Sequence, residues 1–380
     1  MRRAFLLLAL ASLLGAAFSV GFFLSGHGGR AAPQTPSVVD AVRADLATRY
    51  YRPIPERVLR LSSVRTMIAA LDDPYTEYLS RPAYLLLQRE TAGRYTGIGV
   101  TLLPSPDGLL VVATQPGPGR AAGIRVGDVI LRIGTVSTAR LGLANALAAI
   151  AGRPGTTIQL RLRRGALVFP LTVRRAEVHA AAVSGRLGSF GGRVYGYVHV
   201  TVFHAGVATQ LAGEVRSLLR GGATGIVLDL RDDPGGLLDE AIGATSVFLG
   251  HGRVVTLVGA HRPREVFDVS GRAIAPRVPL VVLVDRYSAS SAEIVAAALR
   301  DNHRATLVGE HTFGKAVVQS IDPLADGGAL ALTTARYFTP SGADISRRGL
   351  RPDVHVVDDP RTAMDDVLTT ALGTLAAAQS

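Results

Sequence analysis

The sequence predicts an α/β protein with an inserted β-rich domain and a helical N-terminal segment. Beyond Arg193, strand-like apolar runs alternate with helix-like stretches, which is the pattern of an α/β core. The runs Ile226–Leu230 and Leu280–Val284 are apolar without alternation, as expected for strands covered on both faces. Residues 95–178 differ, because short β-rich runs are separated there by glycine turns.

The composition is that of a folded protein. Its 380 residues are 48% hydrophobic and 19% charged, which is enough apolar material for two or three domains. The chain has no cysteine, so disulfides, thiol catalysis and cysteine-ligated metal sites are excluded. No motif calls for a metal or another cofactor. The formal net charge is +11, but the arginines are scattered, which favours anionic lipid over nucleic acid as a partner.

Residues 1–24 predict a signal anchor or a signal peptide. Arg2 and Arg3 precede the uncharged apolar run Ala4–Leu24, which is long enough to cross a bilayer. An anchor is favoured, because the run is longer than the core of a typical signal peptide and no convincing cleavage site ends it. Residues 25–37 form a Gly/Ser/Pro-rich linker. We therefore expect a protein that is exported or anchored through residues 4–24, on the extracytoplasmic side of the cell envelope.

Residues 38–94 are expected to form an N-terminal helical segment. Val39, Val42, Leu46 and Tyr50 fall on one helical face, and Leu59–Leu71 gives a second amphipathic stretch.

The β-rich region, residues 95–178, contains Gly97-Ile98-Gly99-Val100 and the run AAGIRVGDVIL, which begins at Ala121, and one helix is expected at Leu141–Ala151. These motifs resemble a PDZ domain. In such domains the backbone N–H groups of a glycine loop bind a peptide's C-terminal carboxylate, while the peptide adds a strand to the sheet edge. The resemblance implies that Gly97, Ile98, Gly99 and Val100 bind an apolar C-terminal tail. The alternative is that these glycines only make tight turns.

The α/β core is assigned to residues 179–358, and residues 359–380 form a helical tail of unassigned role. Within the core, the apolar run that ends at Val284 leads through a turn into a helix expected from Ser290 to Leu299. A serine at a helix N-terminus lies where unpaired N–H groups and the helix dipole stabilise negative charge.

Lys315 is the one lysine of the chain, because 40 of the 41 basic residues are arginines. It lies between Phe313 and an apolar Ala-Val-Val run, 25 residues after Ser290. A lysine can deprotonate a serine only when it is neutral, and about one lysine in 2,500 is neutral at pH 7 with an unperturbed pKa. Burial can lower the pKa by several units. The spacing and setting therefore predict a Ser–Lys pair, in which arginine could not replace the lysine.

Gln319 and three backbone N–H groups complete the predicted site. Gln319 is expected on the same face of an extended segment as Lys315, where its amide could orient the amine; otherwise it is an ordinary polar strand residue. The N–H of Ser291 and those of Gly235 and Gly236, in a strand-to-helix turn, are candidate donors to an oxyanion. The alternative is that the two glycines only form the strand-to-helix turn.

Seven motifs resemble the carboxy-terminal processing peptidases, tail-specific serine endopeptidases of family S41. They span about residues 38–358 and are LDDPYTEYLS, YTGIGV, AGIRVGDVIL, DLRDDPGG, YSASSAEIVAAAL, GEHTFGKAVVQ and ARYFTPSGADISRRGLRPDV. The resemblance implies a crotonase- or ClpP-like α/β core and an inserted PDZ domain. It also implies cleavage of protein substrates near their C-termini, with Ser290 as nucleophile, Lys315 as general base and Gln319 as orienter. Ser288 and Ser291 are the rival serines. A homo-oligomer or an adaptor protein remains open as a partner.

Two positions depart from the family's pattern. Ser291 and Ala292 are exchanged relative to the usual order, and Asp233 stands where the family more commonly has asparagine. A carboxylate that pointed into an oxyanion hole would oppose catalysis, so Asp233 is expected to face solvent or to pair with an arginine.

Other functions are less well supported. GEHTFGKA nearly matches a phosphate-binding loop, but Ala316 replaces the Mg²⁺-binding hydroxyl residue. The chain has neither a G-x-S-x-G elbow nor an H-E-x-x-H motif. A catalytically silent PDZ adaptor would have no need of Ser290, Lys315 and Gln319 together.

Overall fold

The computed structural model describes residues 37–114, 117–139, 146–147, 149–179, 181–271, 273–359 and 364–378. The predicted membrane segment and most of the linker lie outside these residues, as does most of the expected helix Leu141–Ala151. No helix within the described ranges is long and apolar enough to cross a membrane. The chain divides into two compact units: one comprises residues up to Thr91 together with those from Ala182 onward, and the other Ala92–Ala181.

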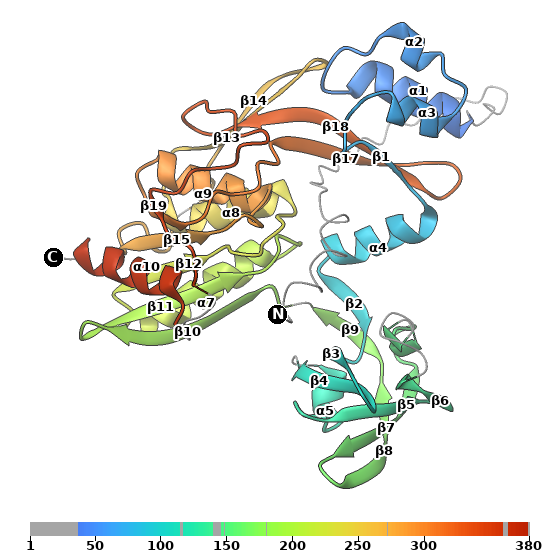
Figure 1. The fold of residues 1–380 in the computed structure, drawn as a ribbon, viewed down its shortest axis with the longest axis vertical. Helices are drawn as coiled ribbons and strands as arrows, with labels where there is room; N and C mark the ends of the chain where they lie inside the picture. The colour runs from blue at the N-terminus through green and yellow to red at the C-terminus, as the bar shows by residue number, and fades with distance from the viewer. Residues whose placement is uncertain are drawn as a thin grey trace. The chain divides into compact units, whose positions relative to one another are not determined.

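A six-stranded, mostly parallel sheet forms the centre of the larger unit (Figure 1). Only its first two strands pair antiparallel, and the later pairs are parallel. The strands, in sheet order, are β10 (Val183–Phe190), β11 (Arg193–Val200), β12 (Gly225–Asp229), β15 (Leu280–Val284), β16 (Thr306–Gly309) and β19 (Val354–His355). The two unbroken apolar runs of the sequence, β12 and β15, are neighbours at its centre and fully buried.

Helices cover both faces of this sheet. Alternate residues of each strand point to opposite faces, so Leu228 and Val282 pack in one apolar cluster and Val227 and Val281 in another. The first cluster includes α7 (Val207–Arg220), α8 (Leu238–Phe248) and α9 (Ser291–Asp301), and the second includes α10 (Asp366–Ala377). An α/β fold is thus confirmed, and the C-terminal segment is a packed helix.

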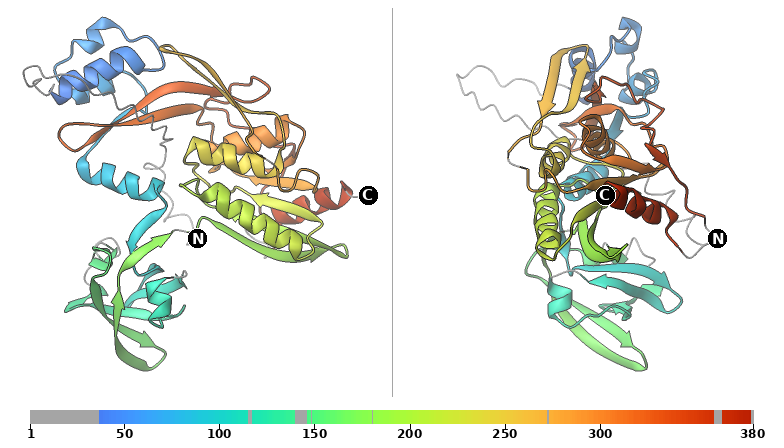
Figure 2. Two further views of the ribbon diagram at one scale, coloured as in Figure 1. Left: turned by 180° about the vertical axis from the view of Figure 1, so that it is seen from behind. Right: turned by 90° about the vertical axis from the view of Figure 1, so that its left-hand side faces the viewer.

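A second, antiparallel sheet extends the larger unit (Figure 2). Its strands are β1 (Glu77–Leu79), β18 (Ala329–Phe338), β13 (Arg253–Gly259), β14 (Arg262–Asp268) and β17 (Val317–Pro323), which pairs with β18. The N-terminal helices α1 (Val38–Arg49), α2 (Glu56–Leu59) and α3 (Val64–Ala69) pack against this sheet through a cluster that includes Val42, Met67 and Leu330. Residues 38–94 are therefore not wholly helical, because β1 joins the sheet before α4 (Arg81–Thr91) begins.

The smaller unit is β-rich and has its own core. Its strands are β2 (Arg94–Gly97), β3 (Val100–Ser105), β4 (Gly108–Thr114), β5 (Val129–Ile133), β6 (Val136–Ser137), β7 (Thr157–Arg164), β8 (Leu167–Arg174) and β9 (Ala176–His179), with a short helix α5 (Pro118–Ala121). Ile98, Ile130 and Leu162 are in its apolar cluster. Asp128, buried beneath the turn, accepts hydrogen bonds from Arg125 N and from the Arg164 guanidinium. This ion pair fixes the glycine turn that precedes β5.

Candidate active site

Ser290 lies at the N-cap of α9, where the backbone has a positive φ that non-glycine residues rarely adopt. Its φ is +52°, a conformation that costs a non-glycine residue about 1–3 kcal/mol. The surroundings hold it there: Ser290 N donates to Glu293 Oε2 at 2.9 Å, and the Tyr337 hydroxyl donates to Ser290 O at 3.3 Å. Ser290 is 8% exposed. A serine at a helix N-terminus after a buried strand is the arrangement that the sequence predicted, and the backbone strain was not foreseen.

Lys315 is buried beside the loop that precedes β1. It is 7% exposed, and burial lowers its pKa to about 8, although the carboxylates of Glu77, Asp73 and Glu293 act in the opposite direction. The Lys315 Nζ lies 5.1 Å from the centre of the Tyr75 ring. With a pKa of about 8, roughly one tenth of the amine is neutral at pH 7.

Glu293 joins the segments that hold Ser290 and Lys315. Its Oε2 accepts from Ser290 N at 2.9 Å and from Lys315 N at 3.0 Å, so the two backbone nitrogens lie within about 6 Å of each other. Its Oε1 accepts from Gly314 N and from the Thr312 hydroxyl. Burial raises the pKa of this carboxyl, and the four hydrogen bonds oppose that rise. Sequence analysis missed Glu293, although a glutamate three residues after an N-cap serine is the signature of a capping box.

Gln319 is buried, but its surroundings differ from the expected ones. β17 begins at Val317, beyond Lys315, and its register shifts between Val318 and Gln319. The argument that Lys315 and Gln319 share one face of a strand is therefore wrong. The Gln319 Nε2 donates to Tyr75 O at 2.5 Å, so it holds the residue whose ring lies beside the lysine amine. A direct contact between the amide and the amine stays a prediction, and Tyr75 was not foreseen.

The glycine turn lies directly against Ser290. A Cβ added to Gly235, whose φ is +95°, would be 2.8 Å from both Ser290 Cβ and Ser291 N. A Cβ on Gly236 would overlap the Phe203 backbone. The Gly235 N–H donates to Asp233 Oδ1 at 2.8 Å. Both glycines are thus required by close approach, and their role toward an oxyanion stays a prediction.

The exchanged pair Ser291-Ala292 has a structural explanation. The Ser291 hydroxyl donates to Gly236 O at 2.9 Å and so ties the first turn of α9 to the glycine turn. Ala292 is fully buried in the core of the larger unit. The third serine, Ser288, is also buried, and its hydroxyl donates to Leu230 O at 2.7 Å.

Asp233 neither faces solvent nor pairs with an arginine, so that expectation is wrong. It is 0% exposed, and its Oδ2 has no hydrogen-bond partner among the residues that the structure describes. The nearby Arg231 is bound instead to Asp229 and Asp365. The turn after β12 buries Asp233 because its main chain is tied to the serine loop, with Ala289 N donating to Asp233 O.

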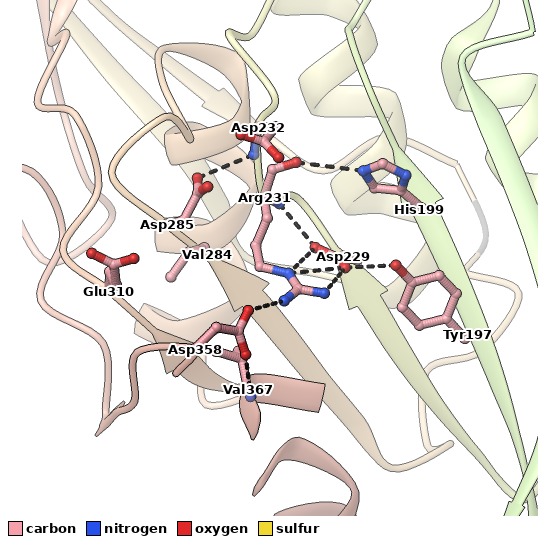
Figure 3. Close-up of a pocket in the computed structure, with 10 residues that line it drawn as sticks. All are labelled: Tyr197, His199, Asp229, Arg231, Asp232, Val284, Asp285, Glu310, Asp358 and Val367. Atoms are coloured by element: carbon pink, nitrogen blue, oxygen red, sulfur yellow. Dashed lines mark hydrogen bonds and ion pairs between the residues drawn. The ribbon is translucent and has the colours of Figure 1, made fainter. Parts of the chain in front are cut away.

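A separate polar cavity of about 300 Å³ lies at the carboxyl ends of the parallel strands (Figure 3). Arg231 extends through it toward Asp229, whose second partner is the Tyr197 hydroxyl. Asp232 N donates to Asp285 Oδ1 at 3.1 Å and so joins the two loops that frame the serine. The residues around the cavity are Tyr197, His199, Asp229, Arg231, Asp232, Val284, Asp285, Glu310, Asp358 and Val367. The hydrogen bonds around this cavity therefore connect the active-site loops at a place outside the predicted site.

The part of the chain that forms this site matches a known family. Residues 194–356 match peptidase family S41. A carboxyl-terminal-processing protease of Picosynechococcus sp. is 37% identical over 314 residues, which cover 81% of this chain and 76% of the relative. The corresponding protease of Synechocystis sp. is 36% identical, over 84% and 76%.

Solved structures agree with these sequence matches. A photosystem II D1 C-terminal processing protease superposes with a TM-score of 0.57 at 27% identity, covering 88% of this chain and 96% of that one. The resemblance inferred from the motifs is thus confirmed. The chain belongs to peptidase family S41 and is a serine peptidase that acts on protein substrates.

Proposed function

We propose that the protein cleaves protein substrates near their C-termini with a Ser290–Lys315 dyad. The observation that supports this most strongly is the shared Glu293 carboxylate, which holds the backbone of both residues within about 6 Å. The depressed pKa of Lys315 and the strained N-cap position of Ser290 add to it. The rival serines Ser288 and Ser291 use their hydroxyls in hydrogen bonds to backbone carbonyls.

The chemistry follows from these positions. Neutral Lys315 takes the proton of the Ser290 hydroxyl as Oγ attacks the scissile carbonyl, and the resulting oxyanion is stabilised by the backbone N–H groups of Gly236 and Ser291, because Gly235 N already donates to Asp233 Oδ1. The C–N bond then breaks, the leaving amine takes the proton from Lys315, and an acyl-enzyme ester remains. Water gives a proton to Lys315 and attacks the ester, the bond between Ser290 Oγ and the acyl carbon breaks, and Lys315 returns the proton to Oγ as the acid product leaves. Gln319 contributes by fixing Tyr75 beside the amine.

We further propose that the smaller unit is a PDZ domain that binds the substrate's apolar tail, and that the core of the larger unit is crotonase- or ClpP-like. In the smaller unit, Ile98 is buried and its carbonyl accepts from Gly119 N at 2.7 Å. Recognition would therefore rest on the backbone N–H groups of Gly97, Ile98, Gly99 and Val100. Extracytoplasmic action, with residues 4–24 as anchor, belongs to the same proposal.

The dyad is tested by cleavage of a protein with an apolar, unstructured C-terminal tail. Ser290→Ala and Lys315→Met are each expected to lose activity by at least about 1,000-fold while retaining the wild-type circular dichroism spectrum. Mass spectrometry of the quenched reaction should find the acyl group on Ser290. Activity that survives Lys315→Met would assign the base to another residue, and an acyl group elsewhere would reject Ser290.

The tail-binding role needs a separate measurement. Binding of a tail peptide to the Ser290→Ala protein is expected to require a free peptide carboxylate, so that amidation of the peptide weakens it about tenfold or more. Equal affinity for the amidated peptide would contradict carboxylate recognition by the glycine loop.

A further inference from the structure

Asp233 is a buried acid, and one of its two carboxyl oxygens forms no hydrogen bond with any residue that the structure describes. Its Oδ1 accepts a hydrogen bond from Gly235 N at 2.8 Å. Its Oδ2 is buried without a partner among the described residues. A carboxylate needs several donors when it is removed from water, so one hydrogen bond is too few for a buried charge.

The charged group that acts on the Asp233 carboxyl is another carboxylate, that of Asp285. Burial raises the pKa of the Asp233 carboxyl well above 3.8, the negative Asp285 raises it further, and the Gly235 N–H opposes both. Asp285 belongs to the loop after β15 and accepts from the backbone nitrogens of Asp232, Tyr287 and Ser288. The neighbouring Arg231 cannot compensate, because Asp229 and Asp365 hold its guanidinium.

Asp233 is also joined to the nucleophile's loop at two points. Its carbonyl accepts from Ala289 N at 2.9 Å, immediately before Ser290. Its side chain holds the peptide of Gly235, the residue whose Cα hydrogen faces Ser290 Cβ so closely that no side chain fits between them. A change of charge on Asp233 therefore acts on Gly235, which lies against Ser290, where negative charge develops during attack.

We propose that Asp233 is a positioning residue that works as an uncharged carboxylic acid, fixing the Gly235 peptide beside Ser290, and that loss of its proton to solvent turns catalysis off. This inference rests on the proposed role of Ser290 as nucleophile. Protonated, Asp233 accepts from Gly235 through Oδ1 and adds no charge. Ionised, it opposes the oxyanion and pulls the Gly235 N–H toward itself. A residue with only a structural role would not make the reaction rate depend on its protonation.

The first test compares kcat/KM of wild-type enzyme and Asp233→Asn across about pH 5 to pH 9. Asparagine keeps the acceptor for Gly235 N but cannot ionise. The ratio of variant to wild-type activity is expected to be constant at low pH and to rise by up to about tenfold per pH unit above the pKa of Asp233. Asp232→Asn removes the solvent-facing carboxyl next to it in the same turn and is the matched control, for which the ratio stays nearly flat. A flat ratio for Asp233→Asn overturns the proposal.

A second test needs no activity. A folded-state pKa above the unfolded value means that the folded protein binds the proton more tightly, so stability is lost as pH rises from about 4 through the folded pKa. The Tm of Asp233→Asn relative to wild type should therefore increase with pH. A constant difference in Tm would show that Asp233 is ionised like an ordinary carboxyl and would overturn the proposal. If the wild-type protein fails to cleave any tail, the proposed function fails, and the Tm comparison still decides the state of Asp233.

Discussion

Two buried carboxyl groups lie next to the segment that holds Ser290, and the protein treats them differently. Glu293 accepts four hydrogen bonds, three from backbone nitrogens and one from a hydroxyl. Within the described part of the chain, Asp233 accepts one, and its second oxygen has no partner there. Both are removed from water, so burial alone does not distinguish them. The number of donors does: the four donors to Glu293 tie two loops together and oppose the rise of its pKa on burial, whereas the single donor to Asp233 opposes it less and favours a neutral acid.

The largest effect is expected from Glu293→Gln, which replaces the carboxylate that accepts four hydrogen bonds. The NH2 group of glutamine would replace one carboxylate oxygen and would face the two hydrogen-bond donors that now point at that oxygen. About 3 kcal/mol of stability should therefore be lost. Displacement of Ser290 or Lys315 should lower kcat by about 100-fold or more. Urea unfolding and steady-state kinetics measure both, with the exposed Glu56→Gln as control. Near-wild-type behaviour would mean that Glu293 does not hold the two segments.

Gly235→Ala changes the residue whose N–H donates to the Asp233 carboxyl. The new Cβ would lie 2.6 Å from Ala289 O and 2.8 Å from Ser290 Cβ, at a φ of +95°. We expect about 2–3 kcal/mol of destabilisation and a loss of activity. Gly222→Ala is the matched control, because Gly222 has a φ of +91° with nothing within 4 Å of an added Cβ. Equal losses in the two variants, measured by thermal unfolding and tail cleavage, would rule out the steric contact with Ser290 as the cause.

A smaller effect is expected from Thr312→Val, which removes one of the four donors to Glu293. The Thr312 hydroxyl also accepts from Leu350 N at 2.7 Å, so its loss should cost about 1–2 kcal/mol. Thr312→Ser keeps the hydroxyl and should recover most of this stability. If valine cost as much as Glu293→Gln does, the carboxylate would depend on a single donor and the contrast with Asp233 would weaken.

The smallest effect is a shift in pH dependence from Glu77→Gln. The Glu77 carboxylate raises the pKa of Lys315, which stands at about 8, so its removal should lower that pKa by less than about one unit. A larger fraction of the amine is then neutral at pH 7, and the rising limb of kcat/KM moves to lower pH. A pH profile shows this directly. A shift to higher pH would contradict the assignment of Lys315 as the base.

The sequence was sufficient for the residues whose own chemistry is unusual. A lone lysine among apolar neighbours predicted that Lys315 is buried, a serine before a helix predicted that Ser290 lies at a helix N-terminus, and unbroken apolar runs predicted the central strands. It was insufficient wherever a side chain's partner comes from a distant segment. Glu293 binds the backbone before β17, Gln319 binds Tyr75, and Asp233 is enclosed by the serine loop. Spacing along the chain does not reveal these partners, because they are set by tertiary packing.

Arg231 connects the glycine turn to the C-terminal helix α10. It lies two residues before Asp233, and its guanidinium binds Asp365, the N-cap residue of α10. The same helix covers Val281 and Leu283 of the central strand through Val367 and Leu372. Deleting α10 would expose this face of the sheet to water and would remove the helix that positions Asp365 against Arg231. The C-terminal helix is therefore part of the core of the larger unit, and a shortened variant of the protein should retain it.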